Sequence, residues 1–422
     1  MEETLINTEV FEKFESNVRS YCRSFPTVFV HSKGAVMTDE NGKNYIDFFA
    51  GAGALNYGHN PQKINDAMID YLKKDGIVHS MDMYTAPKRD FIETFQKNIL
   101  IPKGLNYKIQ FAGPTGTNAV ESAIKLARKV KKRENIFAFM GAFHGMTLGS
   151  LALTTDRDSR NGAGTTLDNV THIPAPYMFP DFDVIKYIET LLEDDHSGIE
   201  KPAAIILESV QADGGIYVFE ADFLKSLREI CDKNDVLLIC DEIQVGCART
   251  GTFFSFERAN IVPDMVTLSK SIGGCGMPMA LLLMKPEYDV WSPGEHTGTF
   301  RGNQLSLVAG KVALGMMKDE SIEEEVCRKG EIVKDFIEKE ILPLDSKIKY
   351  RGIGLIWGID FSEFEKDLTK KVLSACFKNG LIIERVGREN NVMKVMPPLV
   401  IEDELLIEGL NILKKSINEV IN

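Results

Sequence analysis

Between residues 107 and 270, short apolar runs alternate with segments in which apolar positions recur every three to four residues. The first pattern predicts buried strands and the second predicts helices, and their alternation is typical of a parallel α/β sheet. The run 236–240 reads V-L-L-I-C, which indicates a strand buried on both faces. The expected strands are 107–112, 136–140, 203–208, 236–240 and 265–269, and the expected helices are 118–133 and 221–234.

The pattern changes after about residue 310. Helical patterns at 308–317 and 322–342 precede strand-like runs at 354–361 and 392–396, whose short length suits antiparallel pairing. We therefore predict a second, smaller α+β domain. The expected division is an N-terminal segment that packs with the small domain, a large domain and a C-terminal small domain, at residues 1–60, 61–309 and 310–422.

Two chemically matched side chains come at the ends of predicted strands. Asp241 ends the run 236–240, and Lys270 follows the run 265–269. Ligands of open α/β sheets bind at this edge, and a carboxylate with an amine is what pyridoxal 5'-phosphate requires. The lysine binds the cofactor covalently, and the carboxylate keeps the pyridine nitrogen protonated. We predict a pyridoxal-phosphate enzyme with Lys270 and Asp241 as catalytic residues, the alternatives being a surface lysine and a structural acid.

The turn before the helix 118–133 is a candidate phosphate site. Gly113, Pro114 and Gly116 form a tight turn, and Thr117 or Asn118 can cap the helix that follows. The free amides and the dipole of a helix N-terminus attract a phosphate dianion, so we expect Gly116 and Thr117 to bind it. Such turns also serve only to redirect the chain. A nucleotide-binding P-loop is not supported, because no Gly-Lys-Ser/Thr follows.

Three further side chains are candidates for contact with the cofactor. Phe143 and His144 follow the strand 136–140, where Phe143 can stack on a pyridine ring and His144 can lie beside it or transfer protons. The alternative is that both belong to the core. Gln244, three residues after Asp241, can donate a hydrogen bond to the phenolic oxygen of the cofactor.

Composition narrows the possible partners and compartments. The net charge of -12 argues against nucleic-acid binding, and the basic cluster 125–133 fits a solvated helix face. The seven cysteines include no C-x-x-C pair, which favours a reducing cytoplasm and predicts neither disulfides nor a metal site. The N-terminal stretch 1–15 is acidic and lacks the basic and apolar regions of a secretory signal. No apolar run is long enough to cross a membrane, so we expect neither export nor membrane insertion.

Over nearly its whole length the chain resembles the class III aminotransferases, which are pyridoxal-phosphate enzymes of fold type I. The matching motifs are G-T-N-A at Gly116, F-H-G at Phe143, E-S-V-Q-A-D-G-G at Glu208, D-E-I-Q at Asp241, S-K at Lys270, T-F-R-G-N at Thr299 and R-G-I-G-L-I-W-G-I at Arg351. The resemblance implies a large domain with a mostly parallel seven-stranded sheet flanked by helices, plus a smaller α+β domain. It also implies a homodimer or a higher homo-oligomer in which Thr299 reaches the cofactor phosphate of the neighbouring subunit.

Within the family, the run W-S-P-G-E-H-T-G-T-F-R-G-N is most similar to members that begin ectoine synthesis. These enzymes transfer the amino group of L-glutamate to L-aspartate 4-semialdehyde, giving L-2,4-diaminobutyrate and 2-oxoglutarate. The resemblance leaves other reactions open: another class III aminotransferase acting on 4-aminobutyrate, ornithine or diaminobutyrate of a different pathway, an aminomutase, or a scaffold of this fold without the cofactor.

Two positions depart from the wider family and bear on substrate binding. Arg301 stands where many relatives have glycine, and Lys394 stands near Pro-Pro-Leu where many ω-aminotransferases have arginine. Lysine offers a carboxylate only a point charge, whereas arginine grips it with two parallel hydrogen bonds. By resemblance, Glu208 pairs with Lys394 in one half-reaction, with a structural salt bridge as the alternative. Arg301 is a candidate carboxylate binder or an interface contact.

Overall fold

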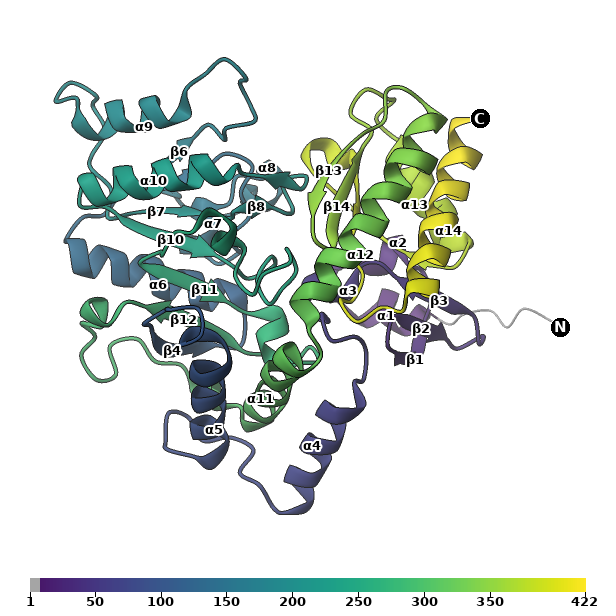
Figure 1. The fold of residues 1–422 in the computed structure, drawn as a ribbon, viewed down its shortest axis with the longest axis horizontal. Helices are drawn as coiled ribbons and strands as arrows, with labels where there is room; N and C mark the ends of the chain where they lie inside the picture. Colours follow the sequence, from purple (N-terminus) through teal and green to yellow (C-terminus); the bar gives the residue numbers. More distant parts are fainter. Residues whose placement is uncertain (1–7) are drawn as a thin grey trace.

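The computed structural model describes residues 8–422, which form two groups of elements lying side by side (Figure 1). Residues 1–7 lie outside the described residues. Two predictions fall partly on them: the N-terminal segment 1–60, and the acidic stretch 1–15 that predicts no secretory signal. No helix among residues 8–422 is long and apolar enough to cross a membrane.

The larger group is built on a seven-stranded sheet in the order β4-β12-β11-β10-β7-β5-β6. Its pairings are parallel except for the two made by β12, which runs antiparallel to both neighbours, so the predicted mostly parallel sheet is confirmed. The strands are β4 (Lys108–Gly113), β5 (Ile136–Phe139), β6 (Val170–Ile173), β7 (Ala204–Leu207), β10 (Leu237–Asp241), β11 (Met265–Leu268) and β12 (Ala280–Met284).

Both faces of this sheet are covered, as the apolar strand sequences require. In β10, Leu237 and Ile239 pack into a core with the first helix after β4, whereas Leu238 and Cys240 pack into the larger core on the opposite face. The helices of this group are α4 (Gln62–Lys73), α5 (Ala86–Phe95), α6 (Gly116–Lys131), α7 (Leu148–Leu153), α8 (Arg157–Arg160), α9 (Val184–Glu193) and α10 (Ala221–Lys233). The short strands β8 (Val210–Gln211) and β9 (Tyr217–Val218) form a hairpin after β7.

The start of α6 differs from the prediction. The helix begins at Gly116 with Thr115 as its N-cap, rather than at Asn118 with a cap at Thr117 or Asn118. The Asn118 Oδ1 atom accepts hydrogen bonds from the Thr115 backbone N–H, at 3.3 Å, and from the Thr115 hydroxyl, at 2.9 Å. Because the side chain of Asn118 bonds back to the turn, the helix gains two residues, and Gly116 and Thr117 supply its first free amides.

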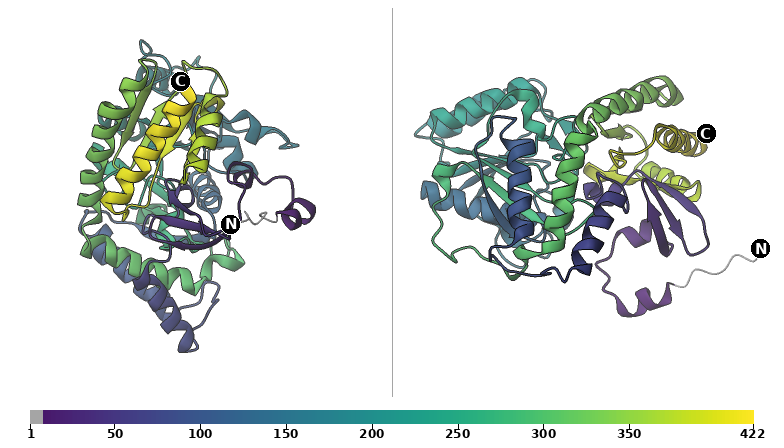
Figure 2. Two further views of the ribbon diagram at one scale, coloured as in Figure 1. Left: turned by 90° about the vertical axis from the view of Figure 1, so that its right-hand side faces the viewer. Right: turned by 60° about the horizontal axis from the view of Figure 1, so that its bottom comes forward.

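The smaller group joins the N-terminal and C-terminal parts of the chain (Figure 2). One sheet contains β1 (Phe29–Lys33), β2 (Val36–Asp39), β3 (Asn44–Asp47) and β15 (Leu381–Ile382), and in it β15 pairs parallel to β3. The other contains β13 (Lys349–Ile353), β14 (Ile356–Asp360), β17 (Val392–Val395) and β16 (Glu384–Val386). The helices of this group are α1 (Glu9–Phe14), α2 (Tyr21–Ser24), α3 (Ala50–Gly53), α12 (Ile322–Phe336), α13 (Leu368–Lys378) and α14 (Asp403–Ile421). The helix that precedes α12, α11 (Gln304–Asp319), packs against α4 and α5 of the larger group.

The predicted strand at 354–361 is present as β14 but is shorter and begins at Ile356, because Gly354 lies in the turn between β13 and β14. Its φ of +56° is in the left-handed region, which favours glycine, and a Cβ there would meet the Arg249 carbonyl oxygen at 2.5 Å. The helix predicted at 308–317 is longer and begins at Gln304, as α11. Since α11 crosses residue 309, one of the predicted domain boundaries falls inside a helix, and the division at 60 and 309 stays a prediction.

Candidate active site

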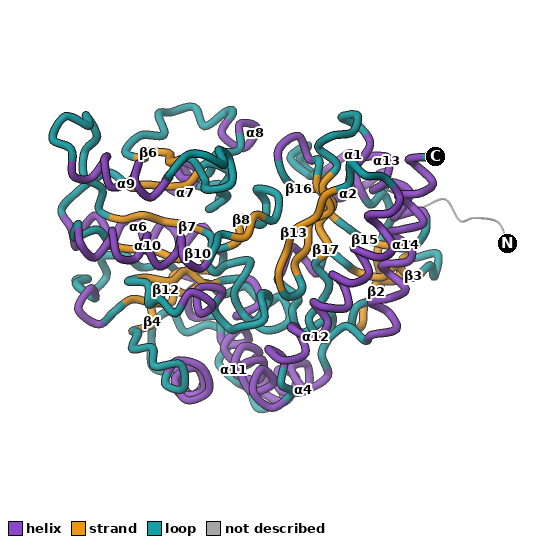
Figure 3. The backbone as a smooth tube through the Cα atoms, turned by 45° about the horizontal axis from the view of Figure 1, so that its top comes forward, coloured by secondary structure: helices purple, strands orange, loops and turns teal. Residues whose placement is uncertain are grey.

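A cavity of about 170 Å³ is lined by residues at the carboxyl ends of strands of the large sheet. This end of the sheet faces the smaller group (Figure 3). The edge of the sheet predicted from the sequence therefore carries the cavity. Eight of the predicted residues line it. They are Gly116 and Thr117 at the start of α6, Phe143 and His144 after β5, Glu208 after β7, Asp241 and Gln244 at the end of β10, and Lys270 after β11.

Asp241 is buried and held by three donors. Its Oδ2 atom lies 2.7 Å from His144 Nδ1, and its Oδ1 atom accepts from the Thr267 hydroxyl at 3.0 Å and from the Ile243 backbone at 3.1 Å. Burial alone would lower the pKa of His144, but the hydrogen bond to Asp241 and the charge of that carboxylate raise it above its usual value. The His144 ring nitrogen Nε2 is buried and has no hydrogen-bond partner among residues 8–422. The carboxylate is thus fixed in position.

Lys270 begins a short 3-10 turn directly after β11, with a φ of +53°. A residue other than glycine in this region carries backbone strain of order 1 kcal/mol, which is common at functional sites. Burial lowers the pKa of the Lys270 ammonium; the carboxylate of Asp213 opposes this shift, and the charge of Lys394 adds to it. A lowered pKa favours the neutral amine, which is the nucleophilic form.

The start of α6 forms one wall of the cavity, through Gly116 and Thr117. The Thr117 hydroxyl lies 2.6 Å from the hydroxyl of Thr147 and 2.5 Å from that of Ser150. A Cβ at Gly116 would lie 3.0 Å from Ile243, so the glycine lets the backbone amides approach the cavity closely. The arrangement of free helix amides and hydroxyls suits a phosphate group.

Lys394 lies in a network that differs from the one predicted. Its ammonium lies 2.7 Å from Glu384, 3.2 Å from Asp213 and 3.0 Å from the Gln244 side-chain oxygen, and it makes no pair with Glu208. Glu208 instead accepts hydrogen bonds from the backbone of Phe143, at 2.9 Å, and of Ala212, at 3.3 Å. The register of β16 and β17 explains the change of partner, because it sets Glu384 directly opposite Lys394.

Sequence reasoning missed Asp213 and Glu384 as site residues. Asp213 lines the cavity and stands in the same E-S-V-Q-A-D-G-G motif as Glu208, so the motif was the signal that could have identified it. Burial alone would raise its pKa, but the charges of Lys394 and Lys270 hold it below the usual carboxyl value. No linear signal marks Glu384, since its place follows from strand pairing.

Thr299 and Arg301 lie away from the cavity within this chain. The side chain of Arg301 pairs with Asp82 at 2.5 Å and donates to the His296 carbonyl oxygen at 3.3 Å, so within this chain it does not line the cavity. Thr299 is exposed in a 3-10 turn, Thr299–Gly302. The predicted contact of Thr299 with a neighbouring subunit stays a prediction.

Glu208 has a predictable pH dependence, because burial raises its pKa to about 8, opposed by His144 and reinforced by Asp241. The folded protein therefore binds this proton more tightly than the unfolded chain, whose carboxyl pKa is 4.5. Glu208 therefore makes its whole contribution to the free energy of unfolding below pH 4.5, and this contribution is lost as the pH rises to about 8. We expect Glu208→Gln to reduce this loss in the cofactor-free protein.

Urea denaturation at both ends of this pH window measures the effect. Glu242 is the matched control, because burial also raises its pKa to about 8 while Ser255 binds its carboxylate away from the cavity. Glu208→Gln and Glu242→Gln should each remove part of the pH dependence of stability, and the double variant should remove more. An unchanged pH dependence in Glu208→Gln would show that Glu208 is already ionised in the folded protein.

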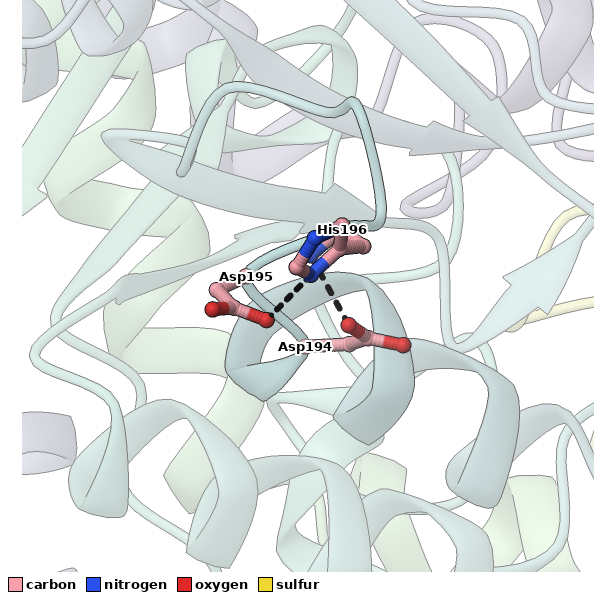
Figure 4. Close-up of side chains that lie close together, drawn as sticks. All are labelled: Asp194, Asp195 and His196. Atoms are coloured by element: carbon pink, nitrogen blue, oxygen red, sulfur yellow. Dashed lines mark hydrogen bonds and ion pairs between the residues drawn. The ribbon is translucent and has the colours of Figure 1, made fainter.

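A separate group of side chains with metal-ligand chemistry lies on the loop after α9 (Figure 4). Ligand atoms of Asp194, Asp195 and His196 lie within 4.8 Å of one another, and all three residues are exposed. The His196 Nδ1 atom lies 2.6 Å from Asp195. Exposed ion pairs of this kind contribute little free energy, and we assign no metal site to them.

The fold and the cavity define a class of enzyme that comparison with known proteins identifies. Residues 19–417 match the family model described as aminotransferase class-III. The chain belongs to this family, and it is a pyridoxal-phosphate-dependent transaminase of fold type I.

Among individual proteins, the chain is 50% identical to the diaminobutyrate–2-oxoglutarate transaminase of Wolinella succinogenes, over 98% of this chain and 96% of that one. It is 52% identical to the enzyme of the same name from Streptomyces coelicolor, over 97% of each chain. Among solved structures it is similar to the ornithine aminotransferase of Toxoplasma gondii, with a TM-score of 0.84 and 26% identity over 97% of this chain and 93% of that one. That structure has partial occupancy of PLP at its active site.

Proposed function

We propose that this enzyme transfers the amino group of L-glutamate to L-aspartate 4-semialdehyde, giving L-2,4-diaminobutyrate and 2-oxoglutarate, as the entry step to ectoine. The observation that carries the proposal is that Lys270 and Asp241 line the same cavity, in a chain 50% identical to a diaminobutyrate–2-oxoglutarate transaminase over nearly its full length. Identity at this level over both whole chains supports the same pair of substrates.

The residues around the cavity fit pyridoxal phosphate. Asp241 is a buried carboxylate without a permanent cation, the His144 side chain that lines the cavity has an unpartnered buried Nε2 atom, and Phe143 offers an aromatic face. The amides of Gly116 and Thr117 suit its phosphate, and the Gln244 amide suits its phenolic oxygen. The cofactor would supply a carbonyl for amine exchange and an electron-withdrawing ring.

In this site the side chains of the protein would bind and orient the cofactor and would move protons at the reacting atoms. The amine of Lys270 would bind the cofactor covalently and would be the group that moves a proton at the reacting carbon of the substrate. Asp241 would hold a proton on the ring nitrogen of the cofactor, and His144 holds Asp241 in position through the 2.7 Å contact. The apolar side chains of Val245 and Ile243 limit access of water to the cavity.

Isotope transfer tests the proposed substrates. The purified enzyme, loaded with pyridoxal phosphate, is incubated with ¹⁵N-labelled L-glutamate and L-aspartate 4-semialdehyde, and products are identified by mass spectrometry. The label should appear at the 4-amino group of 2,4-diaminobutyrate, with an equal amount of 2-oxoglutarate. Transfer to ornithine or 4-aminobutyrate precursors, with none to the semialdehyde, would contradict the proposed acceptor.

We further propose that the enzyme is a homodimer in the cytoplasm. Apolar side chains gather on the segment 77–84 and at Phe300, where Tyr84 is fully exposed and Met83 is 62% exposed. Exposed apolar patches of this kind mark protein contact sites, and exposed Thr299 lies next to Phe300. All seven cysteines are free, which supports a reducing compartment.

Mixing two inactive variants tests whether Thr299 acts across the dimer. Thr299→Glu sets a negative charge against the phosphate and should weaken cofactor binding. Lys270→Ala removes the amine that binds the cofactor covalently and transfers the proton. If each site combines Lys270 of one chain with Thr299 of its partner, random remixing gives heterodimers with one intact site and restores about a quarter of wild-type activity. No recovery after remixing would show that Thr299 does not serve the partner's site.

A further inference from the structure

The ammonium of Lys394 lies between two carboxylates at the side of the cavity. It is 2.7 Å from Glu384 and 3.2 Å from Asp213, and its side chain is completely buried. Burial alone would lower the pKa of Lys394, but the two carboxylates raise it, so the lysine is charged. A single ammonium therefore faces two carboxylates, because the pKa of Asp213 is held low.

Together, Lys394, Asp213 and Glu384 carry one net negative charge. The two acids are partly exposed, whereas the lysine is buried. The Asp213 side chain is 35% exposed and that of Glu384 is 14% exposed. Lys270 also lies within electrostatic reach of both acids, but its amine is committed to the cofactor. A buried carboxylate without a matching cation is costly, so the excess charge calls for a cationic ligand.

The two carboxylate oxygens of Glu384 have different partners. Its Oε1 atom accepts from the Tyr21 hydroxyl at 3.0 Å. Its Oε2 atom is buried and lies 2.7 Å from the charged ammonium of Lys394. The same ammonium is shared with Asp213, so the two acids have one cation between them, and a second ammonium group would balance the charge.

We propose that Glu384, together with Asp213, binds the α-ammonium of the substrate that reacts at its far end, and thereby selects amino acids with a second amine. The inference rests on the proposed function. L-aspartate 4-semialdehyde and L-2,4-diaminobutyrate both carry an α-ammonium two carbons from the reacting carbon. L-glutamate reacts at its own α-amino group and offers no second ammonium, so Glu384 distinguishes the two half-reactions.

Removing the charge from each side of this contact tests the proposal. The Glu384→Gln variant, as cofactor-loaded enzyme, is compared with wild type in single-turnover half-reactions with 2,4-diaminobutyrate, with 4-aminobutyrate and with L-glutamate. 4-Aminobutyrate is diaminobutyrate without the α-amino group. We expect the specificity constant for diaminobutyrate to fall by on the order of 100-fold, because a charge pair loses one partner. The constants for 4-aminobutyrate and glutamate should change by less than about threefold.

Stability separates ligand binding from a structural role. Glu384→Gln leaves Lys394 balanced by Asp213 alone, so its melting temperature without substrate should equal or exceed that of wild type. Glu363→Gln, which removes an exposed partner of Lys349, is the matched control. It should change neither the melting temperature nor the specificity constant for diaminobutyrate. Glu384→Asp keeps the charge and should lose less activity with diaminobutyrate than Glu384→Gln.

Two results would overturn the inference. Equal losses with diaminobutyrate and 4-aminobutyrate would show that Glu384 does not recognise the α-ammonium, and a lowered melting temperature with losses in every half-reaction would make it a structural partner of Lys394. A wild-type enzyme that reacts with glutamate but not with diaminobutyrate would instead contradict the proposed function, whatever the variant does.

Discussion

Lys270→Ala is expected to lower turnover by on the order of 10⁴-fold, because the residue supplies both the nucleophilic amine and the proton transfer at the reacting carbon. The lowered pKa of this lysine favours its neutral, nucleophilic amine, and alanine has no group that replaces it. The variant should still bind pyridoxal phosphate through the start of α6 and Asp241. Steady-state assays and equilibrium dialysis of the cofactor measure the two effects separately.

Small primary amines provide the control for Lys270→Ala. Added methylamine should restore part of the activity, since it enters the space that the side chain leaves and transfers the same proton. Lys285→Ala removes a different lysine, whose ammonium pairs with Asp264 at 2.7 Å outside the cavity, and should retain turnover. Near-normal multiple turnover by Lys270→Ala without added amine would show that another residue performs the chemistry.

Asp241→Asn should produce the second-largest loss, on the order of 100-fold in turnover. Asparagine has nearly the same shape as aspartate but carries no charge, so it cannot stabilise a protonated pyridine nitrogen. The pKa of His144 should fall in the same variant, because the carboxylate that raises it is gone. NMR titration of the histidine ring provides a readout that does not depend on turnover.

A cofactor analogue distinguishes the electrostatic role of Asp241 from a structural one. Pyridoxal phosphate methylated at the ring nitrogen is permanently positive there, so it should restore much of the activity of Asp241→Asn. Thr267→Val is the matched control: it removes the 3.0 Å hydrogen bond to Asp241 but leaves the charge, and we expect a loss of about tenfold or less. No difference between the two cofactors in Asp241→Asn would contradict the pyridinium role.

The sheet was predictable from the sequence because its strands are buried on both faces. An uninterrupted apolar run such as the one ending at Cys240 is difficult to place anywhere except inside a parallel sheet. The antiparallel strand β12 was not predicted, since its run A-L-L-L-M is equally apolar and direction leaves no mark on composition. The turn at Gly354 was missed for a related reason: apolar residues continue on both sides of it, and only its positive φ reveals the hairpin.

The site was predictable where it follows one motif at the end of one strand. Asp241 and Lys270 are of this kind, because Asp241 ends β10, Lys270 follows β11 by two residues, and these neighbouring parallel strands end together. The network around Lys394 joins segments far apart in the chain, namely Asp213, Glu384 and, through its hydroxyl, Tyr21. Its membership depends on the register of β16 and β17 and on the N-terminal segment, neither of which has a local signal.

Lysine at position 394 has a physical consequence for the site. An arginine would bind two carboxylates through a planar set of donors, whereas the lysine ammonium is a compact charge that reaches Glu384, Asp213 and Gln244 from one point. The network therefore holds two acids close together beside the cavity. That arrangement suits a substrate with its own ammonium better than one with only carboxylates.

Sequential absorbance spectra of the purified, cofactor-loaded enzyme test the proposed reaction most directly. L-Glutamate should abolish the visible absorbance of the lysine-bound cofactor as the amino group is transferred to it, and subsequent L-aspartate 4-semialdehyde should restore the band while 2,4-diaminobutyrate appears. Both half-reactions would then take place on one cofactor. A band that glutamate leaves unchanged, or that returns with other carbonyl acceptors but not with the semialdehyde, would contradict the proposed function.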